Sequence, residues 1–312
     1  MIGYLFRRIL QSLIVIIGVT IITFILLHML PGNPVRAILG PKASPADVAS
    51  LTKQLGLNKS LPFQYGLWLW NLAHLDLGYS YKQTASVDTL LAARLPNTLL
   101  LVGTSTVLAI LLAIPLGVLQ AVRRNKPDDY TLTGLAFIFY SMPTFWLGIL
   151  LIIVFSATLN WLPPEPQASI GLFSQLNTLI LPVATLTLVT LALFSRYMRS
   201  SMLENLVQDY VRTAKSKGLS SRRVLFRHVL RNALIPVLTL VGLSIPGIAS
   251  GAVVTETVFN FPGMGYLFFI SAQNDDFPVL LGVTVVIAVA TVIGSLVADI
   301  LYAVADPRIR YV

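Results

Sequence analysis

The chain has 312 residues, of which 55% are hydrophobic and only 11% are charged, and its formal net charge is +9. Soluble domains carry about 25% charged residues, so this composition excludes an ordinary soluble enzyme, and its hydrophobicity excludes a disordered chain. The sequence contains no cysteine, which excludes disulfide scaffolds, thiolate metal sites and cysteine nucleophiles.

Six long apolar stretches account for the composition. Each has about 17 residues or more, the length that an α-helix needs to cross about 30 Å of hydrocarbon. They are apolar on every side, so no single helical stripe explains them. We therefore predict an all-α, polytopic membrane protein with about six transmembrane helices in a single domain over residues 1–312. The predicted spans are Ile9–Leu30, Asn97–Val122, Leu132–Leu159, Thr178–Phe194, Asn232–Val254 and Val279–Ala303.

The distribution of lysine and arginine predicts the orientation. Sixteen of the 22 basic residues fall at the N-terminus, between the second and third spans, in residues 196–231 or at the C-terminus, and the other six fall in residues 31–96. Basic residues near span ends resist translocation. We therefore expect both termini and residues 196–231 in the cytoplasm, and residues 31–96 as a long extracytoplasmic loop. The first stretch is too long for a signal peptide, so it is read as an uncleaved span.

The extracytoplasmic loop contains two local signals. Ser44 followed by Pro45 and Asp47 predicts a helix start, with the serine as N-cap and the acid favoured by the helix dipole. Further on, Tyr65, Trp68 and Trp70 lie in a short apolar run. Because such aromatic residues favour the membrane–water interface, this run either lies along the outer membrane surface or packs as a helix on the body of the protein.

Residues 196–231 carry nine basic residues against two acids. Gly218 can take a positive φ and end a helix, and Ser220 or Ser221 can cap the next one, so the segment predicts helix, sharp turn, helix. One face of the second helix is expected to anchor the segment through apolar side chains, and the opposite face is expected to carry basic side chains that point away. The expected anchors are Val224, Leu225, Val229 and Leu230, and the expected outward residues are Arg222, Arg223 and Arg227.

Three interpretations of this basic segment compete. It can serve membrane topology and anionic headgroups, with each basic residue contributing about 1 kcal/mol. It can bind nucleic acid, which the lack of interleaved base-stacking aromatics argues against. It can also form a docking surface for a soluble partner. Composition alone favours the first interpretation.

Several exact strings make the sequence resemble a known family. It is similar to the inner-membrane permease subunits of ATP-binding-cassette importers of the peptide/nickel family, and within it to the first of the two permeases of dipeptide and oligopeptide systems. The strings that carry the resemblance are residues 30–34, 94–99, 208–219, 231–236, 256–265, 275–279 and 306–310.

The resemblance implies a docking helix that passes motion from an ATPase subunit to the spans. In these importers the helix is built around an alanine and a following glycine, which Ala214 and Gly218 match. Where the wider importer pattern has Glu-Ala, this chain has Arg212-Thr213, as its peptide subfamily does. The implied coupling residues are Tyr210, Arg212, Thr213, Ala214, Lys217, Gly218 and Leu219.

The resemblance also implies the partners and the location. The expected partners are a second homologous permease, two ATP-binding subunits, an extracytoplasmic substrate-binding protein and the lipid bilayer, with no nucleic acid. The expected location is a bacterial inner membrane. The sequence has no Gly-x-x-x-x-Gly-Lys-Ser/Thr string, so we expect that the chain is not itself an enzyme, that it binds no cofactor or metal, and that ATP and Mg are used by partner subunits.

Further candidate residues lie elsewhere in the chain. Glu256, Asp275 and Asp276 fall in the last outer loop and are candidates for contact with substrate or binding protein, or form a solvated rim. Pro246 and Gly247 are a candidate gating hinge, or a packing kink.

The predicted function is a permease subunit of an ATP-driven importer that forms a path for di- or oligopeptides with a second permease. Relatives also carry glutathione, nickel chelates or some sugars. The alternative is an ion-coupled secondary transporter, which normally needs repeated halves and midplane coupling groups. Neither is visible in the sequence, and Asp299 is the one acid inside a predicted span. An intramembrane enzyme would need paired catalytic residues, which are also not visible.

Overall fold

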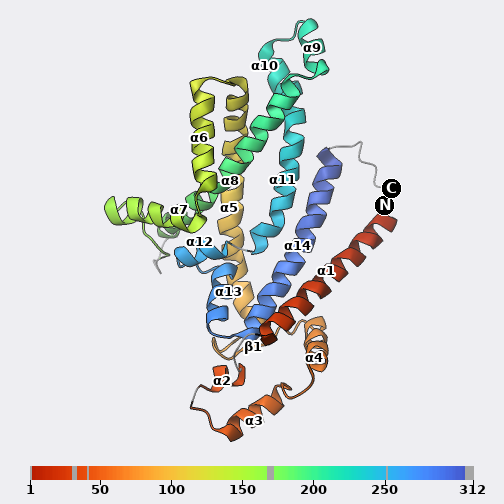
Figure 1. Cartoon of the computed structure of the whole chain (residues 1–312), viewed down its shortest axis with the longest axis vertical. Coiled ribbons are helices and arrows are strands. Elements are labelled where there is room, and N and C mark those ends of the chain that lie inside the picture. The colour runs from red at the N-terminus through yellow and green to blue at the C-terminus, as the bar shows by residue number, and fades with distance from the viewer. Residues whose placement is uncertain (1, 30–33, 41, 167–171, 251, 306–312) are drawn as a thin grey trace.

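Helices dominate the structure, a computed structural model that describes residues 2–29, 34–40, 42–166, 172–250 and 252–305. They form an elongated bundle (Figure 1), which confirms the predicted all-α class. The helices are α1 (Ile2–Met29), α2 (Pro34–Leu39), α3 (Pro45–Gln54), α4 (Leu61–Ala73), α5 (Val87–Val122), α6 (Pro127–Ser141), α7 (Thr144–Leu151), the π-helix η1 (Ile152–Thr158), α8 (Leu172–Leu206), α9 (Asp209–Ser216), α10 (Ser221–Arg223), the π-helix η2 (Val224–Val229), α11 (Leu230–Ser250), α12 (Val253–Val258), α13 (Met264–Gln273) and α14 (Phe277–Ala305).

Five helical stretches of the described residues are long and apolar enough to cross a membrane. They lie in α1, α5, α8, the run from α10 to α11, and α14. The pair formed by α6 and by α7 with η1 becomes a sixth span if it is counted as one broken helix. The prediction of about six membrane helices is therefore confirmed, with one of them broken.

The third predicted span, Leu132–Leu159, is not one straight helix. The chain bends by 106° between Ser141 and Thr144. Met142 and Pro143 both have extended ψ values, 131° and 132°. For Met142 the cause is the following proline, which disfavours the helical conformation of the residue before it. As a result α7 leaves the bundle sideways near mid-height (Figure 1).

Two helices run well beyond the predicted spans. α5 begins ten residues before the predicted start at Asn97 and continues through Pro96 and Pro115. α8 continues past the predicted end at Phe194 to Leu206 and contains Pro182. At 1.5 Å per residue, helices of 35 and 36 residues are about 52–54 Å long, well over the roughly 30 Å of hydrocarbon. Residues 196–206 of the basic segment are therefore part of α8.

The core is divided between the two halves of the bundle. In the half toward α9, Phe194, Met198 and Met202 of α8 are almost fully buried among residues of α5, α9, η2 and α11. In the other half, α5 packs on α12, α13 and α14, and Phe259 is 1% exposed there. The long α5 and α8 contact both regions, so they connect one end of the molecule to the other.

The loop over residues 31–96 is folded, with three short helices and a hairpin of β1 (Tyr79–Ser80) and β2 (Ala85–Ser86). Ser44 is the N-cap of α3, and its hydroxyl accepts a hydrogen bond from the amide of Asp47 at 3.1 Å, which confirms the predicted start. Tyr65 and Trp68 pack on α1 and α14, as expected for a helix on the body of the protein, while Trp70 is 66% exposed.

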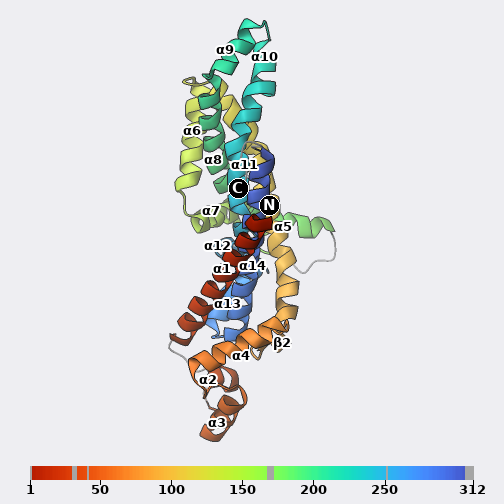
Figure 2. The same ribbon diagram turned by 90° about the vertical axis from the view of Figure 1, so that its right-hand side faces the viewer.

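The chain enters and leaves the bundle on the same side. α1 begins and α14 ends at the side toward which α8 and α11 extend, and α2, α3 and α4 lie at the opposite end (Figures 1 and 2). The two ends lie on the same side because the chain passes along the bundle an even number of times, with the bent pair counted as one span.

Candidate functional site

The segment Gln208–Arg227, here called the basic tip, projects from the end of α8 and α11 (Figure 1). α9 begins after Gln208, whose backbone is extended, and ends at Ser216, with Lys217 as its C-cap. Gly218 has φ +77°, a conformation that favours glycine. The second helix then begins after Ser220. The predicted sequence of helix, sharp turn and helix is confirmed.

One face of the basic tip is fixed to the bundle. Val211 and Ala214 are 2% and 7% exposed and pack in the cluster that contains Met202, Val224 and Val229. Residues three apart lie on the same side of a helix, so α9 is held along one stripe. The expected anchoring of the η2 face by Val224, Leu225, Val229 and Leu230 is confirmed.

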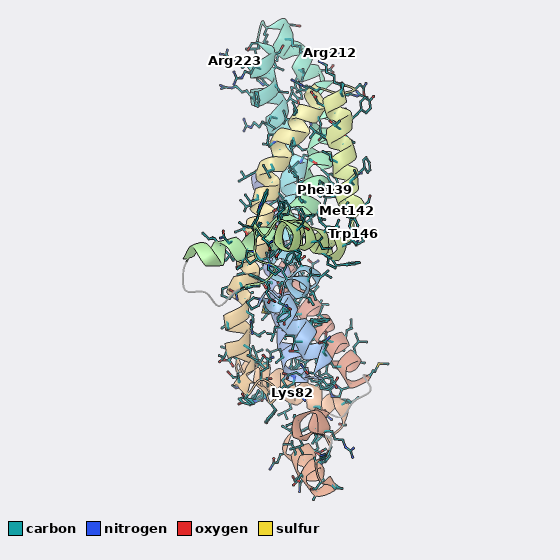
Figure 3. The ribbon with its side chains drawn as sticks, turned by 90° about the vertical axis from the view of Figure 1, so that its left-hand side faces the viewer. Lys82, Phe139, Met142, Trp146, Arg212 and Arg223 are labelled. Carbon is teal, nitrogen blue, oxygen red and sulfur yellow. The ribbon has the colours of Figure 1, made fainter. Side chains whose placement is uncertain are left out.

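The opposite face of the basic tip is open. Arg212 pairs with Asp209 at 3.8 Å, and the two side chains are 81% and 96% exposed, so this pair contributes little to stability. Figure 3 shows Arg212 and Arg223 at the far end of the tip. The exposed residues of the basic tip are Gln208, Asp209, Arg212, Thr213, Lys215, Ser216, Lys217, Gly218, Ser220, Ser221, Arg222, Arg223, Phe226 and Arg227.

The structure divides the implied coupling residues into two groups. Arg212, Thr213, Lys217 and Gly218 are exposed. Tyr210 and Leu219 are half-buried, and the Tyr210 hydroxyl donates to Asn205 Oδ1 at 2.9 Å; Ala214 faces the chain's own core. The alanine of the motif therefore anchors the tip and is not a free surface for a partner.

Gly218 has open space around it within this chain. A Cβ built on this residue would meet no atom of the described chain within 4 Å. The requirement for glycine within this chain is therefore the positive φ alone.

An ion pair at the start of α6 was not predicted from the sequence. The Arg199 guanidinium of α8 donates from Nε and Nη2 to both oxygens of Asp129 at 2.7 and 2.8 Å, and the amide of Asn125 also donates to this carboxylate. Asp129 is 1% exposed. Arg196, one turn earlier, lies over the rings of Phe137 and Tyr140.

The ion pair between Arg199 and Asp129 joins α8, which carries the basic tip, to α6. Its signal in the sequence was an acid in the first turn of α6 and an arginine in the last third of α8.

A second polar cluster lies at the junction of α5, α12 and α13, here called the outer cluster: Thr98, Glu256, Gly263, Met264, Gly265 and Tyr266. Glu256 is 0% exposed. The Thr98 hydroxyl donates to its Oε1 at 2.9 Å and accepts from the amide of Met264 at 2.7 Å, and the amide of Tyr266 donates to Oε2 at 2.9 Å.

Two glycines let the backbone approach this carboxylate. A Cβ at Gly263 would lie 2.4 Å from Glu256 Oε2, and one at Gly265 would lie 2.6 Å from the Cα of Val253. The Pro-Gly-Met-Gly string therefore folds around Glu256. The expectation that Glu256 lies on a solvated rim is wrong, because the side chain is buried and its oxygens are hydrogen-bonded within the chain.

The adjacent acids Asp275 and Asp276 differ in their exposure. Asp276 is 4% exposed and accepts a hydrogen bond from Ser80 of the hairpin, so it joins the loop before α14 to β1. Burial raises the pKa of Asp276 above its ordinary value, while the hydrogen bond from Ser80 and the charge of Lys82 oppose the rise. Asp275 is half-exposed, with φ +54°. Only Asp275 remains available at the surface.

The remaining candidates are located as follows. α11 is continuous through residues 246–247, and a Cβ at Gly247 would meet no atom within 4 Å. The side chains of Pro246 and Asp299 lie outside the described part of the structure, as do residues 306–310. Among the described residues, no three His, Asp or Glu side chains come together as a metal site.

Comparison with known proteins identifies the family. The family described as "Binding-protein-dependent transport system inner membrane component" matches residues 113–311, and its N-terminal companion matches residues 1–102. The chain belongs to this family. It is a multi-pass inner membrane permease. This family assignment argues against the alternative of an ion-coupled secondary transporter.

Individual relatives cover the permease from end to end. The oligopeptide transport system permease protein AppB of Bacillus subtilis (strain 168) is 44% identical over 100% of both chains. The dipeptide transport system permease protein DppB of Alkalihalophilus pseudofirmus is 37% identical, also over 100% of both. A chain of the inward-facing MetNI methionine ABC transporter matches with a TM-score of 0.54, over 70% of this chain and 96% of that chain, at 16% identity, which shows the shared fold alone.

Proposed function

We propose that the permease forms, with a second homologous permease, the path by which an ATP-driven importer moves di- or oligopeptides into a bacterial cell. The observation that carries the proposal is the end-to-end similarity to permeases named for oligopeptides and dipeptides. A path along one chain also needs a long connecting element, and α5 provides it, since it packs in the cores of both halves.

We propose further that the basic tip is the contact with an ATP-binding subunit. A coupling element must be exposed on one face to meet the motor and rigid on the other to pass motion on. The basic tip has both properties: Val211 and Ala214 fix α9 to the bundle, and Arg212 and Lys217 are exposed on the other side. In this proposal two ATPase subunits bind ATP and Mg, and this chain binds neither.

The orientation follows from the same proposal. The basic tip faces the cytoplasm together with both termini, and the folded segment 34–86 faces the extracytoplasmic binding protein. The strong bias of basic residues toward the side of the tip supports this orientation. Asp275 is then the candidate that remains for contact with the binding protein, because Glu256 and Asp276 are buried.

The absence of cysteine gives a direct test of the contact. In the assembled complex, Lys217→Cys is expected to form a disulfide or bifunctional crosslink with a cysteine placed in the ATPase groove. Lys59→Cys, in the segment proposed to face outward, is the matched control and is expected to form none. Crosslinking at Lys59 but not at Lys217 would overturn the proposed contact.

The same two variants test the orientation in intact cells. A membrane-impermeant maleimide is expected to label Lys59→Cys in cells whose outer envelope has been removed, and to label Lys217→Cys only after the inner membrane is opened. Reversed labelling would contradict the proposed topology.

A gating role for α11 is proposed at Pro246-Gly247. Because the Gly247 site has open space, Gly247→Ala fits sterically and favours the helix by about 1 kcal/mol. If the residue acts as a hinge, this variant lowers the peptide uptake rate while the assembled complex keeps its stability. Unchanged uptake would contradict the proposed hinge at Gly247.

A further inference from the structure

An apolar groove runs along the outer half of the bundle, between α4, α5 and α14. Its volume is about 550 Å³, which lies within the range of small-molecule sites. Its walls are aliphatic throughout. The lining residues are Leu72, Leu75 and Leu77 from the end of α4 and the segment after it, Leu95 and Leu99 from α5, and Val285, Val286, Val289, Ala290 and Ile293 from α14.

The groove is open along its length and lies within the membrane-spanning part of α14. Leu99, Val289 and Ile293 are 44%, 40% and 54% exposed. Residues 285–293 fall inside the apolar span Phe277–Val297. Its surroundings are therefore bilayer hydrocarbon or another membrane protein.

Leu75 combines a left-handed backbone conformation with an exposed apolar side chain. This residue has φ +63° and its side chain is 86% exposed. It follows α4 as the left-handed residue of a Schellman-type end, in which the amide of Asp76 donates to the carbonyl of Asn71, a position that normally takes glycine or asparagine. A leucine held there and left exposed gains apolar contact only when something outside the chain covers it.

The end of the groove carries the signs of the membrane–water interface. α4 lies across the outer ends of the spans (Figure 2), and Phe63, Leu67 and Trp70 form an exposed stripe at spacings of four and three residues. The rings of Trp70 and His74 lie 4.7 Å apart, and His74 immediately precedes Leu75. Such amphipathic rings settle at the level of lipid headgroups.

We propose that this groove holds an acyl chain of a membrane phospholipid, with the headgroup near Trp70 and His74. The ligand is a lipid of the bilayer itself, fixed at one place by the three-sided wall of α4, α5 and α14. The strained Leu75 covers the chain at the outer end, and α4 lies along the interface above it. The proposal stands apart from the transport function and does not depend on it.

The character of the lining favours an acyl chain over a helix of a partner. Helices associate closely in membranes over small residues, whereas these walls are leucine, valine and isoleucine, with Ala290 the one small residue among the lining residues. The lining also offers no polar side chain for an interhelical hydrogen bond, one of the contacts on which helix association in membranes depends.

The proposal is tested with the assembled complex in nanodiscs of phosphatidylethanolamine and phosphatidylglycerol. The probe is phosphatidylcholine with a diazirine in one acyl chain, followed by photolysis and peptide mapping. Adducts are expected at residues 95–99 and 285–293 at about tenfold the level found at residues 107–112 of α5, an enrichment equivalent to about 1.4 kcal/mol. Val107 and Leu111, in the comparison segment, are 56% and 62% exposed.

Two variants distinguish the groove from general lipid contact. Ala290→Phe fills the groove and is expected to remove the enrichment, while Val107→Phe, an equal addition on an exposed face outside it, leaves the enrichment unchanged. Leu75→Gly relieves the backbone strain and is expected to lower the labelling without lowering the stability of the complex. Equal labelling of both α5 segments means ordinary boundary lipid, and an unlabelled groove means that protein covers it; either result overturns the proposal.

Discussion

The basic tip and the outer cluster use charge in opposite ways. In the basic tip the charged side chains lie outside, and Arg212 is 81% exposed while Val211 and Ala214 beneath it are buried. In the outer cluster the charge lies inside, and Glu256 is 0% exposed with its oxygens bonded to Thr98 and Tyr266. Both segments carry strings that relate the chain to its family, so a family string alone does not reveal whether its charges meet a partner or hold the fold.

The difference has a physical cause. A buried carboxylate is tolerated only when its oxygens are bonded, and that demand fixes the surrounding backbone down to the glycines at 263 and 265. An exposed arginine is solvated by water and needs no hydrogen-bond partner within its own chain, so its side chain is available to contact a partner. Substitutions should therefore damage the fold in the outer cluster and the coupling in the basic tip.

The largest effect is expected for Glu256→Ala. The variant leaves the Thr98 hydroxyl and the Tyr266 amide without their buried acceptor, at a cost of about 1–3 kcal/mol for each. The thermal midpoint of the purified complex should fall sharply, measured by fluorescence-detected size exclusion. Asp275→Ala, at the half-exposed neighbour acid, is the control and should keep the wild-type midpoint. A Glu256→Ala complex of normal stability but changed peptide affinity would instead place Glu256 at the substrate.

An intermediate effect is expected for Ala214→Leu. The larger side chain overpacks the cluster under α9, which costs about 1–3 kcal/mol, and should detach the helix from Met202 and Val229. Hydrogen exchange should increase over residues 209–216 and not in α14. Lys215→Leu, on the exposed side of the same helix, should leave the exchange unchanged. Equal protection in the two variants would contradict the anchoring role of Ala214.

A smaller effect on the fold, with a larger one on coupling, is expected at Gly218. A leucine at φ +77° is strained by about 1–2 kcal/mol, whereas asparagine tolerates this conformation better. Gly218→Leu should reduce the peptide uptake per ATP hydrolysed in proteoliposomes, and Gly218→Asn should retain more of it. If both variants lose coupling equally, the glycine is required for a close approach by the partner, and the positive φ is not the reason.

The smallest effect is expected from the pH dependence of Asp276. Its folded-state pKa is raised above the ordinary value of 3.8, so its favourable contribution is present below that value and is lost as the pH rises through the folded-state pKa. Asp276→Asn keeps an acceptor for Ser80 and should remove this part of the pH dependence, making the complex relatively more stable at neutral pH. The measurement is the thermal midpoint from pH 4 to pH 8 for both proteins. Parallel curves would contradict the assigned burial effect.

Composition and local signals determined the class, most of the spans and the shape of the basic tip. Apolar runs of sufficient length have few alternatives to crossing a membrane. Ser44 and Gly218 act through hydrogen bonds and φ values within a few residues of themselves, so their effect is visible in the sequence.

The tertiary structure alone decided which charged residues are free. Thr98 reaches Glu256 across 158 positions, Arg199 reaches Asp129 across 70, and Ser80 reaches Asp276 across 196. The burial of Ala214 also depends on the approach of α8 and α11. These contacts join helices that are distant in the chain, and a side chain's burial is set by what packs against it, so no local pattern carries that information.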